Sequence, residues 1–333
     1  MVKILFDKSL LSRRIRLGKA HQSPTLSYSS TEGPKASLCK TESDPSPSSS
    51  TACVIIRDER EYILEWIAYH EIIGFDRFIV YDNGSSDGTI DILAPLDRCG
   101  RIDYVWWPDR PGVVPQLSAY KDAISKVSTE WVSFLDVDEF LNLKSITCIG
   151  DFLRRFPTTV GGVAINWKMF GSSGLRSRQP GLVIERFTRC ADLSHGAGPN
   201  SEYGFAWQVK SVARVRAIES VSFHVHKLKP QFYYTNPSGQ DYLDHSIDFE
   251  VAQVNHYAVK SWEEFLAKSK KNRANFSPEK NAKGEYWEPD PEAAGSCYFQ
   301  AYDLNAMEDV DMLSFSIRVH DRIAQLQHII DNA

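Results

Sequence analysis

The sequence predicts an α/β fold, a mostly parallel sheet with helices on both faces, because short apolar runs alternate with segments of helical periodicity. Residues 52–56 (ACVII) and 77–81 (RFIVY) are near-continuous apolar runs, as in strands buried on both faces of a parallel sheet. Between them, Gly74 follows a stretch of helical spacing and is well placed to end that helix. The apolar and aromatic helical positions are Tyr62, Ile63, Trp66, Ile67, His70 and Ile73.

The same alternation continues to about residue 140. A turn-rich stretch at 82–89 leads into a short helix, and a third strand follows at 102–107. Pro115 can open the next helix, and residues 131–135 (WVSFL) form a fourth buried strand. This order favours right-handed parallel connections throughout.

Beyond Lys144 the pattern loosens into aromatic and glycine-rich pieces. We expect strands of a mixed β extension at 161–174, 183–187 and 209–215. An amphipathic helix is predicted over 261–275, with its basic face at 268–273 turned to solvent or to an acidic partner surface.

Composition divides the chain into three parts. Residues 1–51 are rich in Ser, Pro, Thr and Lys and contain too few apolar side chains to offset the entropy of ordering, so we expect a mobile tail. A folded domain is predicted over 52–275, with one half at 52–140 and the other at 141–275. Residues 276–333 form a C-terminal extension with a terminal helix.

Bulk composition excludes several classes of protein. The 333 residues are 42% apolar, enough for a large core, and the net charge of −5 provides no cationic field to recruit nucleic acid. No apolar run approaches the roughly 18 to 20 residues of a membrane-spanning helix. The N-terminal residues lack the order of a secretory signal, so we expect a cytoplasmic location or atypical routing.

Acidic residues gather where the predicted strands end, which is where open parallel sheets bind ligands. In FLDVDEF (134–140), Asp136 and Asp138 follow an apolar strand two residues apart, so in extended backbone they lie on the same side, roughly 6.6 Å apart. Two such carboxylates suit Mg²⁺ or Mn²⁺, whose shell is normally completed by water and phosphate. The alternative is that both residues only cap a turn.

Asp82 begins the turn that follows the second strand, after Glu59 has followed the first. There a carboxylate could accept hydrogen bonds from a nucleobase or ribose, and the glycines let a ligand approach the backbone closely. An ordinary turn before a helix explains the same residues. Neither a G-x-G-x-x-G fingerprint nor a P-loop occurs in the sequence.

Seven motifs, in order over roughly 52–275, resemble glycosyltransferase family 92 and related family 2-like enzymes of the GT-A fold. One is Gln116 with Ala119 and Tyr120. The others are RDEREYILEWIAYH, YDNGSSDGT, LDVDEF, NWKMFGSSG, VKSVAR and NHYAVKS.

This resemblance implies a transferase that moves a hexosyl group from a nucleotide-sugar donor to a glycan or other hydroxyl acceptor. Asp138 would bind Mn²⁺ (or Mg²⁺) against the donor diphosphate, Asp136 would contact ribose or metal, and Glu139 would orient the loop. Lysines and arginines complement diphosphate charge, although solvated strand-edge cations are equally common. The implied donor-binding residues are Arg57, Glu59, Asp82, Asp136, Lys210, Arg214 and Lys260.

GT-A enzymes often add a histidine ligand from the C-terminal half. His224 and His226 are expected to alternate on one face of a strand in FHVH (223–226), and His256 ends an apolar strand. Any one of the three could bind the metal, with a purely structural imidazole as the alternative for each.

An inverting transfer, which the resemblance also implies, needs a carboxylate to take the proton of the acceptor hydroxyl. Asp192 and Glu202 lie in a glycine-rich, aromatic segment (191–207) and are the candidates, with Glu202 preferred. Two other functions stay open: a non-catalytic protein of this fold that binds nucleotide-sugars or glycans, and a sugar-phosphate nucleotidyltransferase.

Overall fold

A computed structural model describes residues 48–192, 207–242, 247–269 and 298–333, so most of the expected tail lies outside the described residues. The strands are β1 (Ser50–Ile56), β2 (Arg77–Asp82), β3 (Asp103–Trp106), β4 (Trp131–Phe134), β5 (Glu139–Leu143), β6 (Val160–Met169), β7 (Arg189–Cys190), β8 (Val209–Arg214), β9 (Ile218–Ser220), β10 (Lys227–Leu228), β11 (Tyr233–Thr235), β12 (Ala252–His256) and β13 (Met307–Glu308). The helices are α1 (Ile63–Ile72), α2 (Thr89–Arg98), α3 (Pro115–Lys126), α4 (Ile149–Arg154), α5 (Val183–Arg186), α6 (Trp262–Ser269) and α8 (Ser316–Asn332), with short 3₁₀ turns at Val215–Ala217 and Asp311–Phe315.

A nine-stranded sheet organises the part of the chain that the structure describes. Its first half has the order β3-β2-β1-β4, and all three pairings are parallel. The alternating strands and helices predicted from the sequence are therefore confirmed here. Because these strands are parallel, the residues that follow β1, β2 and β4 meet at one edge of the sheet.

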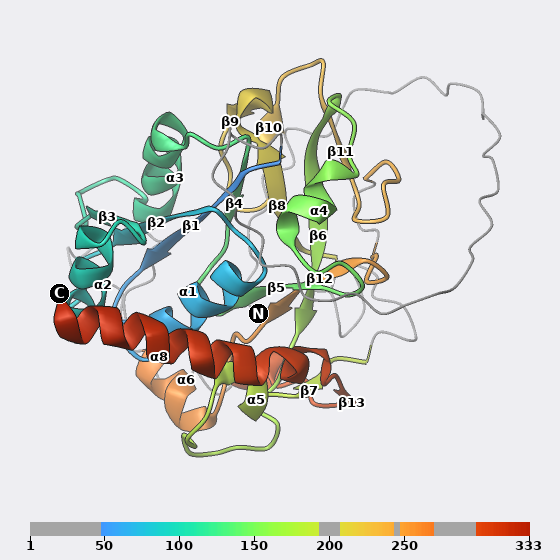
Figure 1. Cartoon of the computed structure of the whole chain (residues 1–333). Helices are drawn as coiled ribbons and strands as arrows, with labels where there is room; N and C mark the ends of the chain where they lie inside the picture. Colours follow the sequence, from blue (N-terminus) through green and yellow to red (C-terminus); the bar gives the residue numbers. More distant parts are fainter. Residues whose placement is uncertain (1–47, 193–206, 243–246, 270–297) are drawn as a thin grey trace, which may run out of the picture. The chain divides into compact units, whose positions relative to one another are not determined.

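Helices cover both faces of this half, as Figure 1 shows. One face packs Val54 and Phe78 against Trp66 of α1 and Leu93 of α2. The other face packs Tyr81 and Phe134 against Tyr120 of α3 and its neighbours. The near-continuous apolar runs of β1, β2 and β4 are thus explained, since helices pack on both faces of these strands.

The second half of the sheet mixes strand directions. β8 lies antiparallel between β4 and β6, while β12 pairs in parallel with β6 and antiparallel with β5. The strands expected at 161–174 and 209–215 correspond to β6 and β8. The strand expected at 183–187 is wrong, because Val183–Arg186 form the helix α5.

A contact from another helix explains α5. The buried carboxylate of Glu65 on α1 accepts the backbone N–H groups of Val183 at 2.8 Å and Ile184 at 3.2 Å. These are donors of the first helical turn, which have no partner within a helix. Burial raises the pKa of Glu65 to about 7. A cap supplied from 118 residues away leaves no trace in the local pattern of apolar residues.

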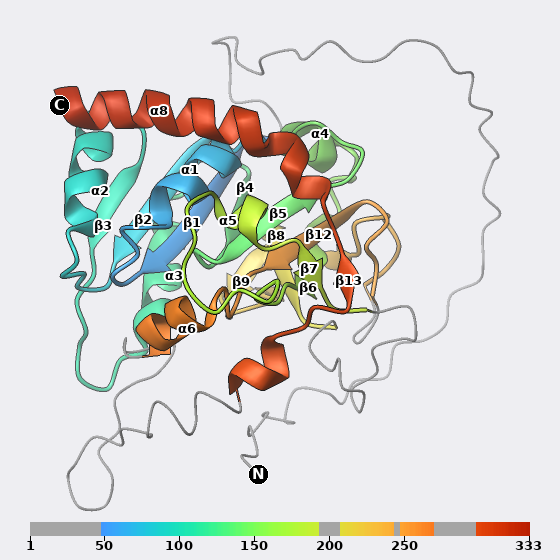
Figure 2. The ribbon, with the colours of Figure 1, turned by 90° about the horizontal axis from the view of Figure 1, so that it is seen from below.

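The terminal helix α8 lies along α1 and α2, on the side away from the sheet (Figure 2). Val319 and Leu326 are its buried residues, and the Phe315 ring packs edge-on against Tyr69 of α1 at 5.3 Å. Arg322 Nε donates to Glu71 Oε2 at 2.6 Å. α1 is therefore enclosed between the sheet and α8.

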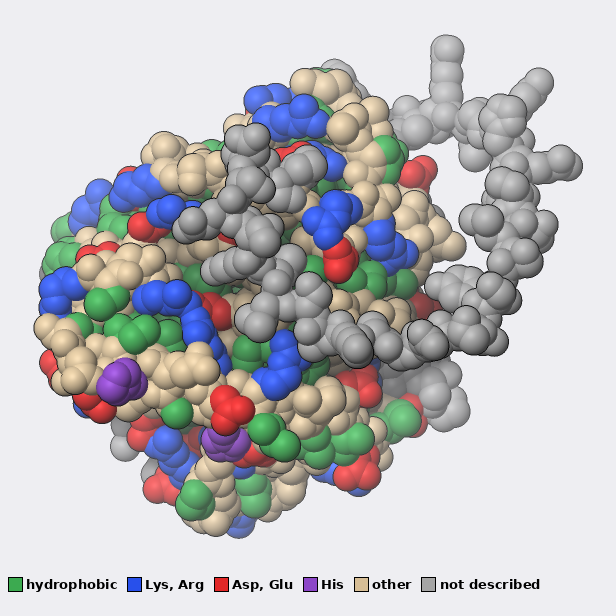
Figure 3. Space-filling model, in the orientation of Figure 1, with side chains coloured by type: hydrophobic (Ala, Val, Ile, Leu, Met, Phe, Trp, Pro, Cys, Tyr) green, Lys and Arg blue, Asp and Glu red, His purple; other side chains and the backbone are tan. Residues whose placement is uncertain are grey.

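The surface of the described residues carries charge of both signs. In Figure 3, basic and acidic side chains are interspersed over the described part of the face shown. None of the described helices combines the length and the apolar character needed to cross a membrane.

Gly162 of β6 lies directly beneath an aromatic ring, which makes it a sharp test of this packing. A Cβ there would fall 2.2 Å from Tyr234 Cε1, which is inside van der Waals contact. We expect Gly162→Ala to lower the free energy of unfolding in urea by about 1 to 3 kcal/mol. Gly150→Ala in α4, where the nearest atoms are 3.7 Å away, is the matched control and should cost nothing. Equal stability of the two variants would contradict the packing described.

Candidate active site

Two carboxylates mark the edge of the sheet where the parallel strands end. Asp136 and Asp138 lie in the short connection between β4 and β5, and Glu139 is the first residue of β5. β12 pairs antiparallel with β5, so that His256 stands opposite Glu139. Tyr257 N donates to Asp138 O at 2.8 Å, which fixes this loop against the end of β12.

Lys210 of β8 holds the D-x-D loop in place through its ammonium group. Its Nζ lies 3.1 Å from Asp136 Oδ2 and 3.2 Å from Glu139 Oε2. Glu139 Oε2 also accepts the backbone N–H of Asp136 at 2.8 Å. Gln116 of α3 donates to Asp136 Oδ1 at 2.9 Å. Asp136 is thereby oriented by three separate elements of the fold.

Burial and neighbouring charges shift the pKa values of Lys210 and Glu139. Burial would lower the pKa of Lys210, but the carboxylates of Asp136 and Glu139 outweigh it and hold that pKa well above its usual range. Burial raises the pKa of Glu139, against the opposing effect of the Lys210 ammonium. Lys210 is therefore a permanent buried cation, with Asp136 the more exposed of its two partners.

Asp138 is buried and also faces cationic groups. Its Oδ2 contacts the Nζ of Lys268 on α6 and lies 3.7 Å from His256 Nε2. Burial would raise the pKa of Asp138, but the Lys268 ammonium and then His256 outweigh it and hold that pKa well below its usual range. The basic face of the predicted helix was expected to face solvent or an acidic partner, and for Lys268 this is wrong.

The three candidate histidines have different surroundings. His256 and His224 both pack against the Trp167 ring, with centroids 4.4 and 5.2 Å away. His226 packs instead against Phe134, and its Nδ1 accepts the N–H of Ser222. Burial lowers the pKa of His224 and of His226 to about 4. Of the three, His256 is the one within 4 Å of an aspartate of the D-x-D pair.

The strand predicted for FHVH is wrong, because residues 223–226 form a bend between β9 and β10. The bend is held by side-chain contacts to the backbone. His224 Nδ1 lies 3.1 Å from Val209 O, and His226 N donates to the Tyr234 hydroxyl at 3.0 Å. His224 and His226 therefore do not lie on one face of a strand, as the sequence had predicted.

Lys260 lines a cavity of about 270 Å³ between the β1–α1 loop and α6. Its ammonium lies 4.4 Å from the centre of the Tyr62 ring, and its φ of 55° is unusual for a residue other than glycine. Burial, then the neighbouring Lys268, lowers the pKa of Lys260. Glu59 and Lys268 line the same cavity, which therefore adjoins Asp138.

Side chains join the loop after β1 to the loops after β2 and β3. Arg57 forms an ion pair with Asp109 at 2.8 Å, and Asp58 Oδ1 accepts the N–H of Ser86 at 2.6 Å. The buried Asp82 accepts from Ser85 N at 2.8 Å and from the Tyr104 hydroxyl at 3.2 Å. These contacts are those of an ordered turn, with Asp82 serving as its cap.

Arg214 does not join the site. Because β8 is antiparallel to β4, Arg214 pairs with Trp131 at the start of β4, at the opposite edge from Asp136. There its guanidinium donates to Val160 O and Phe156 O and pairs with Glu130. We therefore remove Arg214 from the donor-binding residues. Glu202 lies outside the described residues, and Asp192 is the last residue before that gap.

Comparison with known proteins assigns the chain to a family. The sequence model described as glycosyltransferase family 92 matches residues 49–290. The chain belongs to glycosyltransferase family 92. Family 92 proteins of Oryza sativa and Ricinus communis are 29% and 27% identical to it, over 66% and 69% of this chain. The alignments cover 35% and 39% of those relatives, so the chain spans less than half the length of the curated relatives it matches.

Solved structures that resemble this chain share little sequence with it. One is S. aureus TarS in complex with UDP, with 15% identity over 51% of this chain and 47% of that chain, at a TM-score of 0.32. Another is the mannosyltransferase PcManGT from Pyrobaculum calidifontis in complex with GDP-Man and Mn²⁺, with 19% identity over 37% of each chain, at a TM-score of 0.29. The sequence predicted a mostly parallel GT-A sheet with a mixed extension. The strand order of this family 92 chain confirms that fold class.

Two residues of this family 92 chain act at the site without having been assigned a role from the sequence. Gln116 was noted only as part of a motif, although its position one residue into α3 places it beside the end of β4. Lys268 follows Glu264 at an (i, i+4) spacing that normally indicates a solvated helix face. Neither contact has a sequence signal, since both depend on which elements become neighbours.

Removing Lys210 should leave the carboxylates of Asp136 and Glu139 without their cation. We expect Lys210→Met to lower the free energy of unfolding by about 3 kcal/mol or more, because an uncompensated buried charge is costly. Lys227→Met breaks the exposed pair with Glu219 and, as the matched control, should cost less than about 1 kcal/mol. Urea unfolding at pH 7 measures both, and similar losses would contradict a central role for Lys210.

Proposed function

We propose that this chain transfers a sugar from a nucleotide-sugar donor to a hydroxyl group of a glycan or other acceptor, with a divalent cation at Asp138. The observation that carries the proposal is the meeting of Asp136, Asp138 and His256 with three buried or partly buried lysines at the carboxyl edge of the sheet. Open α/β sheets bind nucleotides at this edge. Membership of family 92 supports the same reaction class.

The residues present fit a divalent ion that is shared with substrate. No group of three or more His, Cys, Asp or Glu side chains that could hold a metal by themselves occurs in the described ranges. Asp138 and His256 offer one oxygen and one nitrogen, and His256 Nδ1 is buried with no hydrogen-bond partner among the described residues. Mg²⁺ and Mn²⁺ commonly take one or two protein ligands and complete their shell with water and phosphate. Lys268 now provides the positive charge beside Asp138.

The chain's own residues would then orient the donor and balance its charge. When bound, the cation would neutralise negative charge on the departing nucleoside diphosphate. Lys210 keeps the Asp136 carboxylate facing the edge of the sheet, and Lys260 and Lys268 present ammonium groups on the wall of the 270 Å³ cavity. Such cations strengthen their hold on phosphate oxygens as charge develops.

Replacing Asp138 should weaken nucleotide binding that depends on a metal and leave metal-independent nucleotide binding unchanged. We expect Asp138→Asn to weaken UDP or GDP binding in the presence of Mn²⁺ by about 100-fold while leaving binding without Mn²⁺ unchanged. Isothermal titration calorimetry on the whole chain measures both. Asp321→Asn, an exposed aspartate of α8, is the control. Metal-dependent binding that survives Asp138→Asn would overturn the assignment of the cation.

The contact of Lys268 with Asp138 favours a second candidate, in which buried ammonium groups replace the metal altogether. Lys268→Met distinguishes the two candidates. If the cation binds Asp138, this variant should bind Mn²⁺ about tenfold more tightly in the absence of nucleotide, because a competing charge is gone. If lysines replace the metal, it should lose nucleotide binding and EDTA should have no effect. Lys121→Met, an exposed lysine of α3, is the control.

We further propose inversion at the anomeric carbon, with Asp192 or Glu202 accepting the proton of the acceptor hydroxyl. A single displacement needs a base on the side opposite the leaving group. Asp192 follows β7, within two residues of Cys190, which pairs with Phe170 just beyond β6. The anomeric configuration of the first product, read by proton NMR, tests inversion directly, and a retained configuration would refute it.

A further inference from the structure

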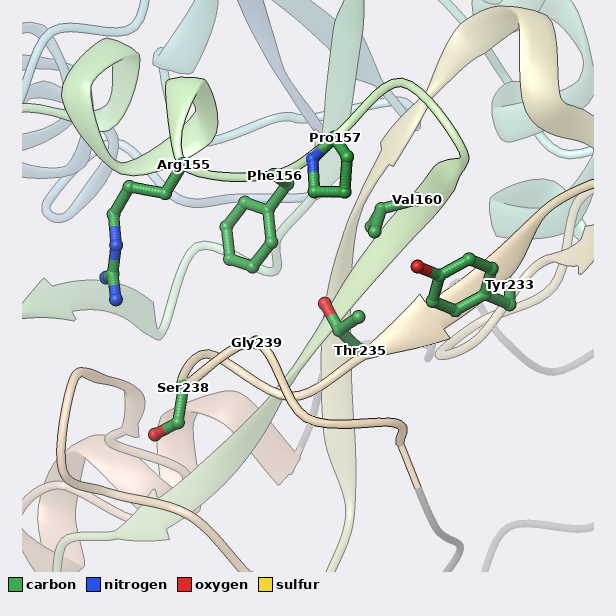
Figure 4. A pocket seen from close by; sticks show the side chains of 8 residues that line it. All are labelled: Arg155, Phe156, Pro157, Val160, Tyr233, Thr235, Ser238 and Gly239. Atoms are coloured by element: carbon green, nitrogen blue, oxygen red, sulfur yellow. The ribbon is translucent and has the colours of Figure 1, made fainter. Parts of the chain in front are cut away.

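A second cavity, of about 140 Å³, lies between α4 and the turn after β11 (Figure 4). Its volume equals about five water molecules at the roughly 30 Å³ each occupies in the liquid, so it can admit one edge of a sugar ring. Arg155 and Phe156 form one wall, and Tyr233, Thr235 and Ser238 form the other. Val160, the first residue of β6, lies at its base.

This cavity is distant from the D-x-D carboxylates. Val160 begins β6, whereas Trp167 of the same strand packs against His256 at the active site. Seven residues of extended strand separate the two, which is roughly 23 Å. The cavity therefore belongs to a different edge of the sheet from the site already described.

One buried polar group of the cavity wall, the Thr235 hydroxyl, lacks a partner in the described part of the chain. Thr235 is 2% exposed, and its Oγ1 has no hydrogen-bond partner. Figure 4 shows this hydroxyl directed into the cavity, with the Tyr233 hydroxyl turned toward it. A buried hydroxyl without a partner costs free energy that a bound polar ligand recovers.

Charge and shape define the ligand class. Arg155 is the charged residue that lines the cavity, and its guanidinium forms no ion pair with a described residue. Guanidinium groups bind carboxylates through two parallel hydrogen bonds. Phe156 and Tyr233 supply aromatic surface for an apolar ring face, while Thr235 supplies a hydroxyl. We propose that this cavity binds a single acidic sugar unit, such as a uronic acid residue of a glycan.

Strand pairing anchors one wall of the cavity to the sheet. β11 pairs with β6, and the Tyr234 ring lies on the backbone of Gly162, which has no side chain to displace it. Tyr234 also accepts the N–H of His226. Because this wall is already in place, little conformational entropy of the protein is lost when a ligand binds. The site needs neither metal nor nucleotide, so it stands independently of the proposed transfer reaction.

Methyl NMR of the whole chain tests the proposal. With Val and Thr methyl groups labelled, methyl β-D-glucuronide should shift the Val160 and Thr235 resonances and leave Val54 in the sheet core unchanged. Methyl β-D-glucoside, which lacks the carboxylate, should bind at least about tenfold more weakly. Arg155→Gln should remove this difference, and Arg98→Gln, an exposed arginine of α2, should preserve it.

A second variant and a third ligand make the result decisive. Thr235→Val replaces the unpaired hydroxyl by a methyl group and should weaken binding of glucuronide about fivefold while the protein stays folded. Glucuronide that shifts neither methyl group, or that binds Arg155→Gln as tightly as the unmodified chain, overturns the proposal. Sodium sulfate binding as tightly as glucuronide also overturns it, because the cavity would then recognise an anion and not a sugar.

Discussion

The site depends on the Lys210 ammonium, which joins Asp136 and Glu139 beneath the edge of the sheet. Without this cation, the buried Glu139 and the partly exposed Asp136 would face each other with no positive charge between them. β8, inserted antiparallel between β4 and β6, is the strand that brings the lysine there. The mixed half of the sheet therefore supplies the charge that the parallel half requires, and neither half would form the site alone.

Positive charge surrounds the carboxylates before any ligand arrives. Lys268 contacts Asp138, and Lys260 lies nearby over the Tyr62 ring. Binding of the proposed anionic donor would be an exchange, in which lysines give up carboxylate partners for phosphate oxygens. A site of this kind discriminates by how well the ligand replaces existing contacts, because uncompensated charge on either side is expensive.

Local patterns predicted the parallel half well and the site in part. The apolar runs of β1, β2 and β4 and the position of Asp136 and Asp138 after β4 follow from neighbouring residues alone. Lys210 and Arg214 show the limit, since both are buried cations on one strand, four residues apart. Only the antiparallel direction of β8 decides that one reaches the site and the other the opposite edge. The helix α5 was also beyond local patterns, because its cap is Glu65 of α1, a residue distant in the sequence.

The position of α8 over α1 has a consequence for how the protein is made. Arg322 and its partner Glu71 are 251 residues apart in the chain. At the usual speed of synthesis the ribosome takes on the order of ten to fifty seconds to make that interval. Even after β4 has completed the parallel half, the side of α1 that α8 later covers stays exposed until α8 is made. We therefore expect this side of α1 to be open to chaperones until α8 packs against it.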